Sequence, residues 1–461
     1  MQRGVPAEVV QSVKDRVLDI LGVSLAALPL PTSAAAADHV RDQGGAPQAH
    51  AIGIKEMLPS SAAAFVNGVL AHSLDYDDTH LPSIVHPSAS VIPASLAAAE
   101  LAGAGGRTTI SAIGVGLEIC IRLGMAGYDA GTRTSIFFDR GQHATSICGT
   151  VASAGAAAAL LGLDAEGIAH AIGIAVSMAS GVIEGNRAGG TVKRIHCGLA
   201  AQAGVNAALL AQGGITGPPT ALEGRFGFFQ AFLGERHDAA AVTEGLGENW
   251  SVPDIFFKPY PCNHFTHSGI DAALSLRKKG LSPGDVEEVH LGVASATVRT
   301  IGEPIERKRA PETGYEAQFS GPYTVAAALV GGSGLGLGLS DFTDELARDP
   351  ARRDLMARVI VEPNAECDSI YPLQFPAVLE VRTRDGAEMS ERVLANRGGP
   401  DRPLRTEELE TKFRENALRV LDEVGAESLK DIIARMETLD DIRDLFEPAG
   451  AADLTKGEKR G

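Results

Sequence analysis

Six ionisable side chains gather in one short stretch of otherwise apolar sequence. The stretch H-S-L-D-Y-D-D-T-H-L-P-S-I-V-H-P carries three histidines and three carboxylates, which are His72, Asp75, Asp77, Asp78, His80 and His86. The Ala-rich residues before and after it are typical of buried helix. Buried ionisable groups are costly unless they are paired or used in chemistry, and they concentrate at functional sites. We therefore expect part of an active site here, although one or two of these residues could simply cap helices.

Other polar residues are set into apolar sequence further along the chain. His143 stands directly before a long uncharged segment, where it could transfer protons or only cap a helix. The motif G-N-R-A-G-G-T-V-K-R-I-H-C-G carries Lys193, Arg194 and His196 and leads into an Ala-rich helix. Cations and backbone N–H groups in such a place can converge on a carboxylate. That pattern favours substrate binding over a solvated loop.

Two more motifs lie in the second half of the chain. K-P-Y-P-C-N-H-F-T-H ends at His267 and falls where the sequence pattern changes, so we expect it at a domain junction, a common place for ligand sites. E-A-Q-F-S-G-P-Y ends at Tyr323, whose hydroxyl could orient a substrate or donate a proton. We expect His86, His143, Lys193, His267 and Tyr323 to line one cleft between two domains.

The sequence carries no familiar signal for a cofactor or a resident metal. It has no G-x-S-x-G, H-E-x-x-H or Walker motif. The Gly-rich run at 331–339 follows an expected helix rather than a strand, unlike a dinucleotide-binding loop. A metal site made of His72, Asp75 and His86 is an alternative, but it lacks a standard ligand spacing. We expect side chains to do the chemistry without a cofactor.

Composition limits the partners of this chain. Its 461 residues, 44% hydrophobic and 21% charged, indicate a soluble globular protein with more than one domain. A net charge of -17 with scattered basic residues disfavours nucleic acid and anionic membranes as partners. The five cysteines stand apart without a C-x-x-C motif, which argues against disulfides, a zinc ribbon and an iron–sulfur cluster. A reducing cytoplasm is the expected location.

Neither of two apolar segments is expected to enter a membrane. The first apolar helix carries Lys14, Asp15 and Arg16 and is not a signal peptide. Residues 144–163 are uncharged over a membrane's width but consist mostly of small side chains. Small residues let helix backbones approach closely, so we expect a central helix of a soluble bundle.

The periodicity of apolar residues predicts helices through the first half of the chain. They are expected at 6–28, 109–123, 144–163, 164–180 with Asp164 as N-cap, 198–212 and 222–233. After Lys258, alternation predicts strands at 286–293, 357–361 and 377–383, with helices at 262–279 and 320–330. Helix returns over 406–446, and the tail from Gly450 is expected to fray. The predicted fold is mainly α, with residues 1–262 and 398–461 forming a helical domain and residues 263–397 an inserted α+β lid.

Together these motifs resemble the MmgE/PrpD family, which includes 2-methylcitrate dehydratase, cis-aconitate decarboxylase and iminodisuccinate epimerase. The resemblance covers nearly the whole chain and rests on five ordered motifs: H-S-L-D-Y-D-D-T with H-P, H-A-T-S-I-C-G-T-V-A-S-A, K-R-I-H-C-G-L-A-A, K-P-Y-P-C-N-H-F-T-H and E-A-Q-F-S-G-P-Y. It implies a helical domain built from both chain ends, a smaller α+β lid and a homodimer. It also implies active-site roles for Asp75, Thr79, His86, His143, Lys193, His267 and Tyr323.

The reactions of that family build or quench negative charge on a carbon beside a carboxylate. A histidine near neutrality is a natural general base, and Lys193 with Arg194 could hold substrate carboxylates. We therefore predict a hydro-lyase acting on a small di- or tricarboxylate such as 2-methylcitrate. The expected catalytic residues are His86, His143, Lys193, His267 and Tyr323, and the expected substrate-binding residues are Asp75, Thr79, Arg194 and His196.

Other activities stay open at this point. Decarboxylation or epimerisation of a similar polycarboxylate is the main alternative. The Gly331–Leu339 run is expanded relative to the family pattern, and His86 is about one residue further from Thr79 than in the decarboxylase branch, so the reaction itself stays open. An inert helical protein that binds small anions is the alternative from another class. Turnover assays beside calorimetry with tricarboxylates would separate it from an enzyme.

Overall fold

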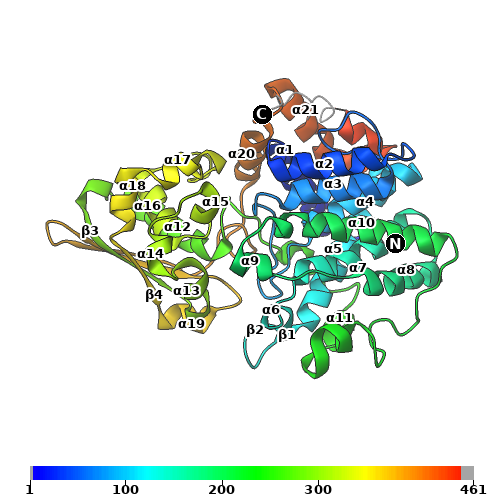
Figure 1. The fold of residues 1–461 in the computed structure, drawn as a ribbon, viewed down its shortest axis with the longest axis horizontal. Helices are drawn as coiled ribbons and strands as arrows, with labels where there is room; N and C mark the ends of the chain where they lie inside the picture. Colours follow the sequence, from blue (N-terminus) through cyan, green and yellow to red (C-terminus); the bar gives the residue numbers. More distant parts are fainter. Residues whose placement is uncertain (1–3, 448–461) are drawn as a thin grey trace. The chain divides into compact units, whose positions relative to one another are not determined.

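The protein is described by a computed structural model that covers residues 4–447, apart from the side chains of residues 186 and 187. Helices hold 57% of the residues and strands 9%, so the prediction of a mainly α protein is confirmed. The chain forms two compact units (Figure 1). Unit 1 runs to Ile255 and resumes at Phe413, and unit 2 is Phe256–Lys412. These bounds differ from the predicted breaks at 262/263 and 397/398, and the role of unit 2 as a lid stays a prediction.

Unit 1 is a bundle of helices drawn from both ends of the chain. Its long helices are α1 (Ala7–Ala27), α2 (Pro31–Gln43), α3 (Ser60–His72), α4 (Ser88–Ala102), α5 (Gly106–Ala126), α7 (Ala144–Leu160), α8 (Ala165–Met178), α10 (His196–Gln212) and α21 (Glu423–Ala434). Helix α7 lies at the centre, where it packs against α4, α5, α8 and α10. From the far end of the chain, α21 returns to pack beside α1 (Figure 1).

Short elements connect the long helices of unit 1. They are the hairpin of β1 (Tyr128–Asp129) and β2 (Thr134–Ser135), the helices α6 (Ile136–Asp139), α9 (Glu184–Ala188) and α11 (Ala240–Thr243), and a 3-10 turn over Val192–Ile195. The 3-10 turn leads directly into α10, so its residues lie beside the first residue of that helix.

Glycines set how closely the central helices approach. A Cβ atom on Gly68 of α3 would lie 2.8 Å from the Cα of Gly198 in α10. A Cβ atom on Gly204 of α10 would lie 2.4 Å from the Cβ of Ser153 in α7. No larger residue fits at these crossings without moving a backbone. The close crossing of α3 and α10 joins the last turn of α3 to the first turn of α10.

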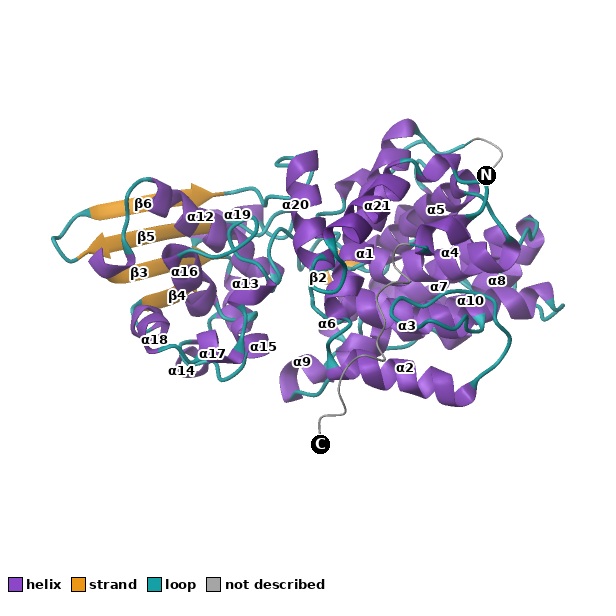
Figure 2. Ribbon diagram, turned by 90° about the horizontal axis from the view of Figure 1, so that it is seen from above, coloured by secondary structure: helices purple, strands orange, loops and turns teal. Residues whose placement is uncertain are grey.

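Unit 2 is a four-stranded sheet with helices packed on it. The strands β3 (Val286–Val293), β4 (Val359–Pro363), β5 (Ala377–Thr383) and β6 (Glu388–Val393) lie in the order β4-β3-β5-β6 (Figure 2). Strands β3 and β4 are parallel and the other pairs are antiparallel. The helices are α12 (His267–Lys278), α13 (Ser295–Ile301), α14 (Ile305–Lys308), α15 (Gly314–Ala317), α16 (Gly321–Val330), α17 (Asp344–Ala347), α18 (Pro350–Met356) and α19 (Ala365–Ile370). Helix α20 (Thr406–Ala417) crosses from unit 2 into unit 1.

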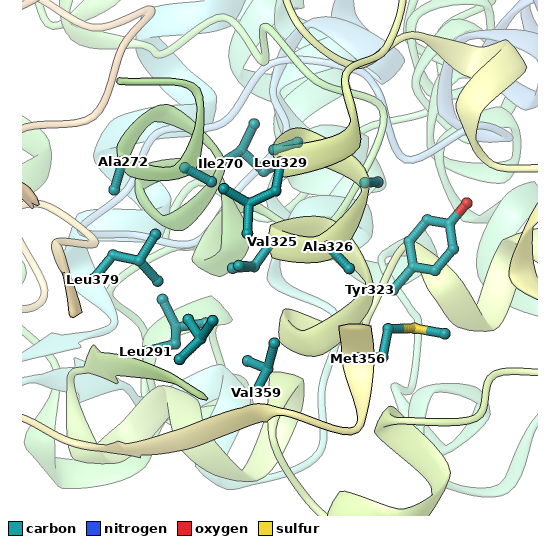
Figure 3. Close-up of a cluster of buried hydrophobic side chains, with 14 of the residues drawn as sticks. Ile270, Ala272, Leu291, Tyr323, Val325, Ala326, Leu329, Met356, Val359 and Leu379 are labelled. Carbon is teal, nitrogen blue, oxygen red and sulfur yellow. The ribbon is translucent and has the colours of Figure 1, made fainter. Parts of the chain in front are cut away.

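The core of unit 2 lies between the sheet and the helix pair α12 and α16. Ile270, Leu291, Val325 and Leu379 pack together there, one from each of α12, β3, α16 and β5 (Figure 3). Strand β3 alternates half-buried and buried positions from Glu288 to Leu291 only after a register irregularity between Val286 and Glu288, so the predicted alternation holds over part of the strand.

Most predicted elements are present, and three predictions were wrong in part. Residues 222–227 form turns rather than helix, because the chain doubles back so that Phe228 N–H reaches the carbonyl of Ala221, and only a π-helical turn, Phe229–Leu233, follows. Strand β6 was missed, since E-M-S-E-R-V is a largely exposed edge strand with little apolar signal. Helix α21 ends at Ala434 and short 3-10 turns follow it to Phe446. The tail from Gly450 lies outside the described residues.

One described helix is long and apolar enough to span a membrane by composition alone. This helix, α5, has 78% of its apolar window buried within the fold, as expected for a core helix. The expectation of no membrane partner stays a prediction.

Candidate active site

The loop between α3 and α4 holds the polar stretch that opens the sequence argument. Its three aspartates are buried, and each lies against a basic side chain from a different segment. The pairs are Asp75–Lys193, Asp77–His72 and Asp78–Arg16, with N–O distances of 2.9, 2.7 and 2.9 Å. These partners offset the cost of burying the carboxylates. The stretch is therefore a buried network rather than a set of solvated caps.

The Asp78–Arg16 pair anchors the loop to two helices. Both side chains are 1% exposed. Arg16 Nη2 also donates hydrogen bonds to the carbonyls of Val252 and Ile255, at 3.2 and 2.8 Å. Asp78 accepts hydrogen bonds from the hydroxyl and the backbone N–H of Ser88, the first residue of α4. Asp78 thus links α1 to the start of α4 and satisfies an N–H group that the helix itself cannot.

Two residues of this loop hold unfavourable backbone conformations. Asp75 has φ of 52° and the β-branched Ile84 has φ of 53°. Such positions cost about 1–3 kcal/mol each and persist only where surrounding contacts enforce them. A backbone hydrogen bond from His80 to Val85, 2.9 Å long, closes the loop around Ile84. Strain of this kind gathers at functional sites, which agrees with the expected role of the loop.

The tautomer of His86 follows from its contacts. Its Nδ1 lies 2.7 Å from the carbonyl oxygen of Asp78 and 3.1 Å from the hydroxyl of Thr79. A carbonyl oxygen can only accept, so Nδ1 carries a proton. In the neutral ring the basic lone pair is therefore on Nε2. The backbone N–H of His86 donates to the hydroxyl of Thr145, which fixes the residue against the start of α7.

His143 and His196 form a second histidine pair. His143 precedes α7 as its N-cap, and His196 is the first residue of α10. Their Nδ1 atoms are 2.9 Å apart, so one ring donates the shared proton and the other accepts it. Burial lowers the pKa of His196 to about 4, helped by the positive charges of His72 and Lys193. Burial, with His72 next in importance, also lowers the pKa of His143 well below its ordinary value. Both rings are neutral at pH 7.

Four histidines of unit 1 form one cluster. The ring of His72 lies 5.4 Å from that of His86 and 5.7 Å from that of His143. The rings of His143 and His196 are 4.9 Å apart. We call His72, His86, His143 and His196 the histidine cluster. The structure thus brings together His86, His143 and His196 from three separate sequence motifs.

Lys193 supplies the cation at the edge of this cluster. It lies on the 3-10 turn before α10, and its side chain is 15% exposed while bound to Asp75. Its positive charge contributes to lowering the pKa of His143, which places it within electrostatic reach of that ring. Arg194 follows on the same turn and is half-buried. This turn can present two cations to an anionic ligand beside the histidines.

The remaining two predicted residues belong to unit 2. His267 begins α12 and is buried, with Nε2 3.1 Å from the carbonyl of Cys262. Tyr323 lies in the core of unit 2 (Figure 3). Its hydroxyl donates to the carbonyl of Asp341 and accepts from Arg352 Nη1 at 2.8 Å. Burial raises the pKa of the Tyr323 phenol. Their convergence with the histidine cluster in one cleft stays a prediction.

Sequence reasoning gave no catalytic or binding role to three residues of the network. His72 and Asp77 were recognised as part of the polar stretch, but their pairing could not be read from spacing. Arg16 lies 62 positions before its partner. The available signal was an arginine inside an apolar helix, because a buried charge needs a partner. Within residues 4–447, no group of three or more His, Cys, Asp or Glu side chains is placed to hold a metal ion, so the alternative of His72, Asp75 and His86 gains no support.

A buried, neutral His143–His196 pair beside a lysine is the chemistry expected of an enzyme that moves protons next to carboxylates. The chain belongs to the MmgE/PrpD family, since residues 3–240 match the family's N-terminal domain and residues 260–438 its C-terminal domain. The resemblance found in the motifs is thereby confirmed, and the protein is an enzyme of the MmgE/PrpD type.

Three curated relatives of this chain bear the name cis-aconitate decarboxylase. Cis-aconitate decarboxylase of Homo sapiens is 33% identical over 83% of this chain and 78% of its own length. The protein of the same name from Mus musculus is 31% identical over 83% and 77%. Cis-aconitate decarboxylase of Aspergillus terreus is 27% identical over 96% of this chain and 92% of its own.

Proposed function

We propose that this enzyme is a lyase that acts on a small polycarboxylate, and that decarboxylation of cis-aconitate is its leading candidate reaction. The observation that carries the proposal is the neutral His143–His196 pair beside Lys193, in a chain whose similar relatives are named for that reaction. The decarboxylase alternative thus moves ahead of the predicted dehydration. The reaction would need no cofactor if side chains supply both the charge and the proton.

The proposed reaction has a simple balance of atoms. The bond between a carboxylate and its neighbouring carbon breaks, CO₂ leaves, and the electron pair remains on the carbon skeleton. One proton must then reach carbon, and the enzyme recovers that proton from water. Lys193 and Arg194 would hold carboxylates, and their charge would stabilise the electron-rich intermediate. His143 would deliver the proton.

A neutral histidine can become that acid when the substrate binds. A polycarboxylate brings several negative charges to a buried site of low dielectric. Negative charge favours the protonated imidazole and therefore raises the pKa of His143 in the complex. Binding would draw one proton into the His143–His196 pair, where it is needed after CO₂ leaves.

Dehydration of a 2-methylcitrate-like substrate is the second candidate. The observation that favours it is the tautomer of His86, whose Nε2 carries the lone pair of a general base. His86 would remove a proton beside a carboxylate, and the His143–His196 pair would protonate the leaving hydroxyl. Epimerisation of an iminodisuccinate-like substrate would instead require these groups on opposite faces of one carbon.

A substrate screen separates these reactions. The purified protein is incubated with cis-aconitate, citrate, 2-methylcitrate or iminodisuccinate, and products are followed by ¹H NMR and by release of CO₂. Lys193→Met tests whether turnover belongs to this site, and Lys55→Met, an exposed lysine of the same unit, is the matched control. Turnover of cis-aconitate that Lys193→Met lowers and Lys55→Met leaves unchanged supports the proposal. Turnover of 2-methylcitrate alone would replace it with the second candidate.

We also propose a cytoplasmic homodimer that pairs through α8 and α10. These helices contact each other, and α10 has no Asp, Glu, Lys or Arg although Leu199 and Leu210 are 40% and 44% exposed. An uncharged helix with outward leucines is typical of an interface rather than of a solvated face. Free buried cysteines support the reducing location.

A further inference from the structure

Gln318 joins the two sequence motifs of unit 2, and the reactions proposed above give this residue no role. The motif K-P-Y-P-C-N-H-F-T-H ends at His267, and the motif E-A-Q-F-S-G-P-Y contains Gln318. The side-chain Nε2 of Gln318 donates a 2.8 Å hydrogen bond to the carbonyl of Pro261, 57 positions away. The backbone carbonyl of Gln318 accepts a 2.8 Å hydrogen bond from the N–H of Asn263. Gln318 therefore holds the chain on both sides of Cys262.

The segment that carries Gln318 is itself fixed within unit 2. Gln318 is the C-cap of α15 and is 6% exposed. Lys308 Nζ donates to the carbonyl of Phe319 at 2.8 Å, and the hydroxyl of Ser320 donates to the carbonyl of Lys308. Because the two residues that follow it are bonded to one partner, Gln318 is a rigid support for the chain at Cys262.

The carbonyl of Cys262 faces the ring of His267. Nε2 of His267 lies 3.1 Å from that carbonyl oxygen, and the side chain is buried. A carbonyl oxygen only accepts, so Nε2 carries a proton whether the ring is neutral or charged. Nδ1 is then the nitrogen through which the ring of His267 can gain or release a proton.

Ring packing alone does not select this orientation of His267. Its ring lies 4.5 Å from the ring of His264 and 5.3 Å from that of Tyr260. These contacts fix the plane of the imidazole, but the two flipped orientations of an imidazole fill nearly the same space. A hydrogen bond to a carbonyl that is held in place selects one of them. The orientation of His267 thus depends on the Cys262 carbonyl and, through it, on Gln318.

We propose that Gln318 is a positioning residue for His267. Gln318 holds the Cys262 carbonyl, and that carbonyl sets which ring nitrogen of His267 is presented for proton transfer. This inference rests on the proposed function, for which His267 is one of the expected catalytic side chains. A glutamine that only stabilised the turn could be replaced without any change at the ring of His267, so the two roles can be separated.

The first measurement needs neither a substrate nor a variant of Gln318. The ring nitrogens of the ¹⁵N-labelled full chain are followed by NMR at neutral pH, and the signals of His267 are assigned by their loss in His267→Gln. We expect Nε2 of His267 to carry a proton that exchanges slowly with water. A ring whose proton is on Nδ1 alone would overturn the proposal.

Variants then test the link between Gln318 and the ring. Gln318→Met removes the amide donor and keeps an unbranched side chain of similar length. Thr383→Val is the matched control, because Thr383 is also 6% exposed and donates to a backbone carbonyl of unit 2, that of Ala387 at 3.0 Å. We expect Gln318→Met to shift both ring ¹⁵N signals of His267 and to speed exchange of its Nε2 proton about tenfold, the equivalent of one hydrogen bond. Thr383→Val should change neither. Unchanged His267 signals in Gln318→Met would overturn the proposal.

A kinetic arm fails separately from the proposed function. With whichever polycarboxylate is turned over, Gln318→Met should lower kcat about tenfold with little change in KM, because fewer His267 rings are oriented for proton transfer while Lys193 still binds a carboxylate. Normal kcat in either Gln318→Met or His267→Gln would overturn the positioning role. If the wild type turns over no polycarboxylate, the proposed function fails, while the NMR arms still decide whether Gln318 orients His267.

Discussion

A pair of histidines that shares one proton can act as an acid or as a base with little rearrangement. In the His143–His196 pair the two Nδ1 atoms are held 2.9 Å apart by the starts of two helices. Burial keeps both rings neutral, so the free enzyme has basic nitrogens and no spare proton. The charge of the bound ligand then decides whether the pair gains a proton. One set of residues could therefore serve the different reactions of this family.

The sign of the pH dependence should separate those reactions. The pKa of His196 is about 4 in the free enzyme, and that of His143 is also lowered. If the pair must act as a base, kcat/KM should be level at neutral pH and fall as pH drops toward about 4, where the bases become protonated. If the pair must first take up a proton, kcat/KM should fall about tenfold for each pH unit above the lowered pKa. The measurement is kcat/KM from pH 4 to 8. The decarboxylase proposal requires kcat/KM to fall as the pH rises.

Substitutions of His143 and Lys193 should change different kinetic parameters. His143→Gln should lower kcat by roughly 10²–10⁴-fold with little change in KM, because it removes proton transfer alone. Lys193→Met should raise KM as well, since a carboxylate loses a charge-assisted hydrogen bond worth about 1.5–3 kcal/mol. Steady-state kinetics and circular dichroism of both variants check this. Near-normal kcat in a double variant of His86 and His143 would exclude them as the proton-transfer pair and shift attention to His267.

Buried histidine should also make the fold sensitive to acid. Burial lowers the pKa of His80 to about 4 from an ordinary 6.5, and its Nδ1 bonds the Ser83 hydroxyl at 2.7 Å. In the unfolded chain this ring binds a proton below pH 6.5, whereas the folded chain excludes it until about pH 4. Its stabilising contribution is complete above pH 6.5 and is lost between those values, with a slope of up to about 1.4 kcal/mol per pH unit. The free energy of unfolding, measured by urea at several pH values, should fall less steeply between pH 6.5 and about 4 in His80→Gln than in the wild type.

At the scale of elements, helix ends position the chemistry. His72 ends α3, His143 precedes α7 and His196 begins α10, so the cluster forms where three helices meet. Local signals predicted much of this, including the N-cap at Asp164, whose side chain accepts from the N–H of Gly167. The meeting of the helix ends was not readable from sequence, because it depends on which helices cross and how closely.

The crossing of α3 and α10 should be intolerant of any added side chain. A Cβ atom on Gly198 would lie 2.5 Å from the carbonyl oxygen of Phe65 and 2.6 Å from Cγ2 of Val69. Gly198→Ala must therefore push α10 away from α3, at about 1–3 kcal/mol for an overpacked core. We expect a melting temperature several degrees lower and a loss of activity larger than the loss of folded protein.

A control at the other end of the same helix isolates that effect. Gly213, the C-cap of α10, has φ of -76° and its nearest neighbouring atom would be 3.4 Å from an added Cβ. Gly213→Ala should leave both melting temperature and activity close to those of the wild type. Equal effects of the two substitutions would show that the helix crossing does not control the site.

At the scale of the whole molecule, the sequence predicted which polar residues lie in apolar surroundings. It could not predict which of these residues contact each other. His86, His143 and His196 come from motifs that are 57 and 53 positions apart, and their contacts arise only from the packing of the bundle. The partner of Asp78 is Arg16 on the first helix, a contact across 62 positions with no local signal. Unit 2 likewise begins seven residues before the expected break at 262/263 and ends fifteen residues after the expected break at 397/398.

The proposed homodimer is tested at the same scale. Leu199 and Leu210 are eleven positions apart, about three helical turns, so they lie on one face of α10. Replacing both with glutamate should place like charges on either side of a twofold interface and convert the dimer to a monomer. Sedimentation velocity or light scattering would measure the mass.

Val424→Glu is the control, since Val424 is 78% exposed on α21 and lies outside the proposed interface. A wild type that is monomeric at micromolar concentration, or a double variant that stays dimeric, would contradict pairing through α8 and α10. Because α10 begins at His196, loss of the dimer should also reduce activity through the turn that carries Lys193.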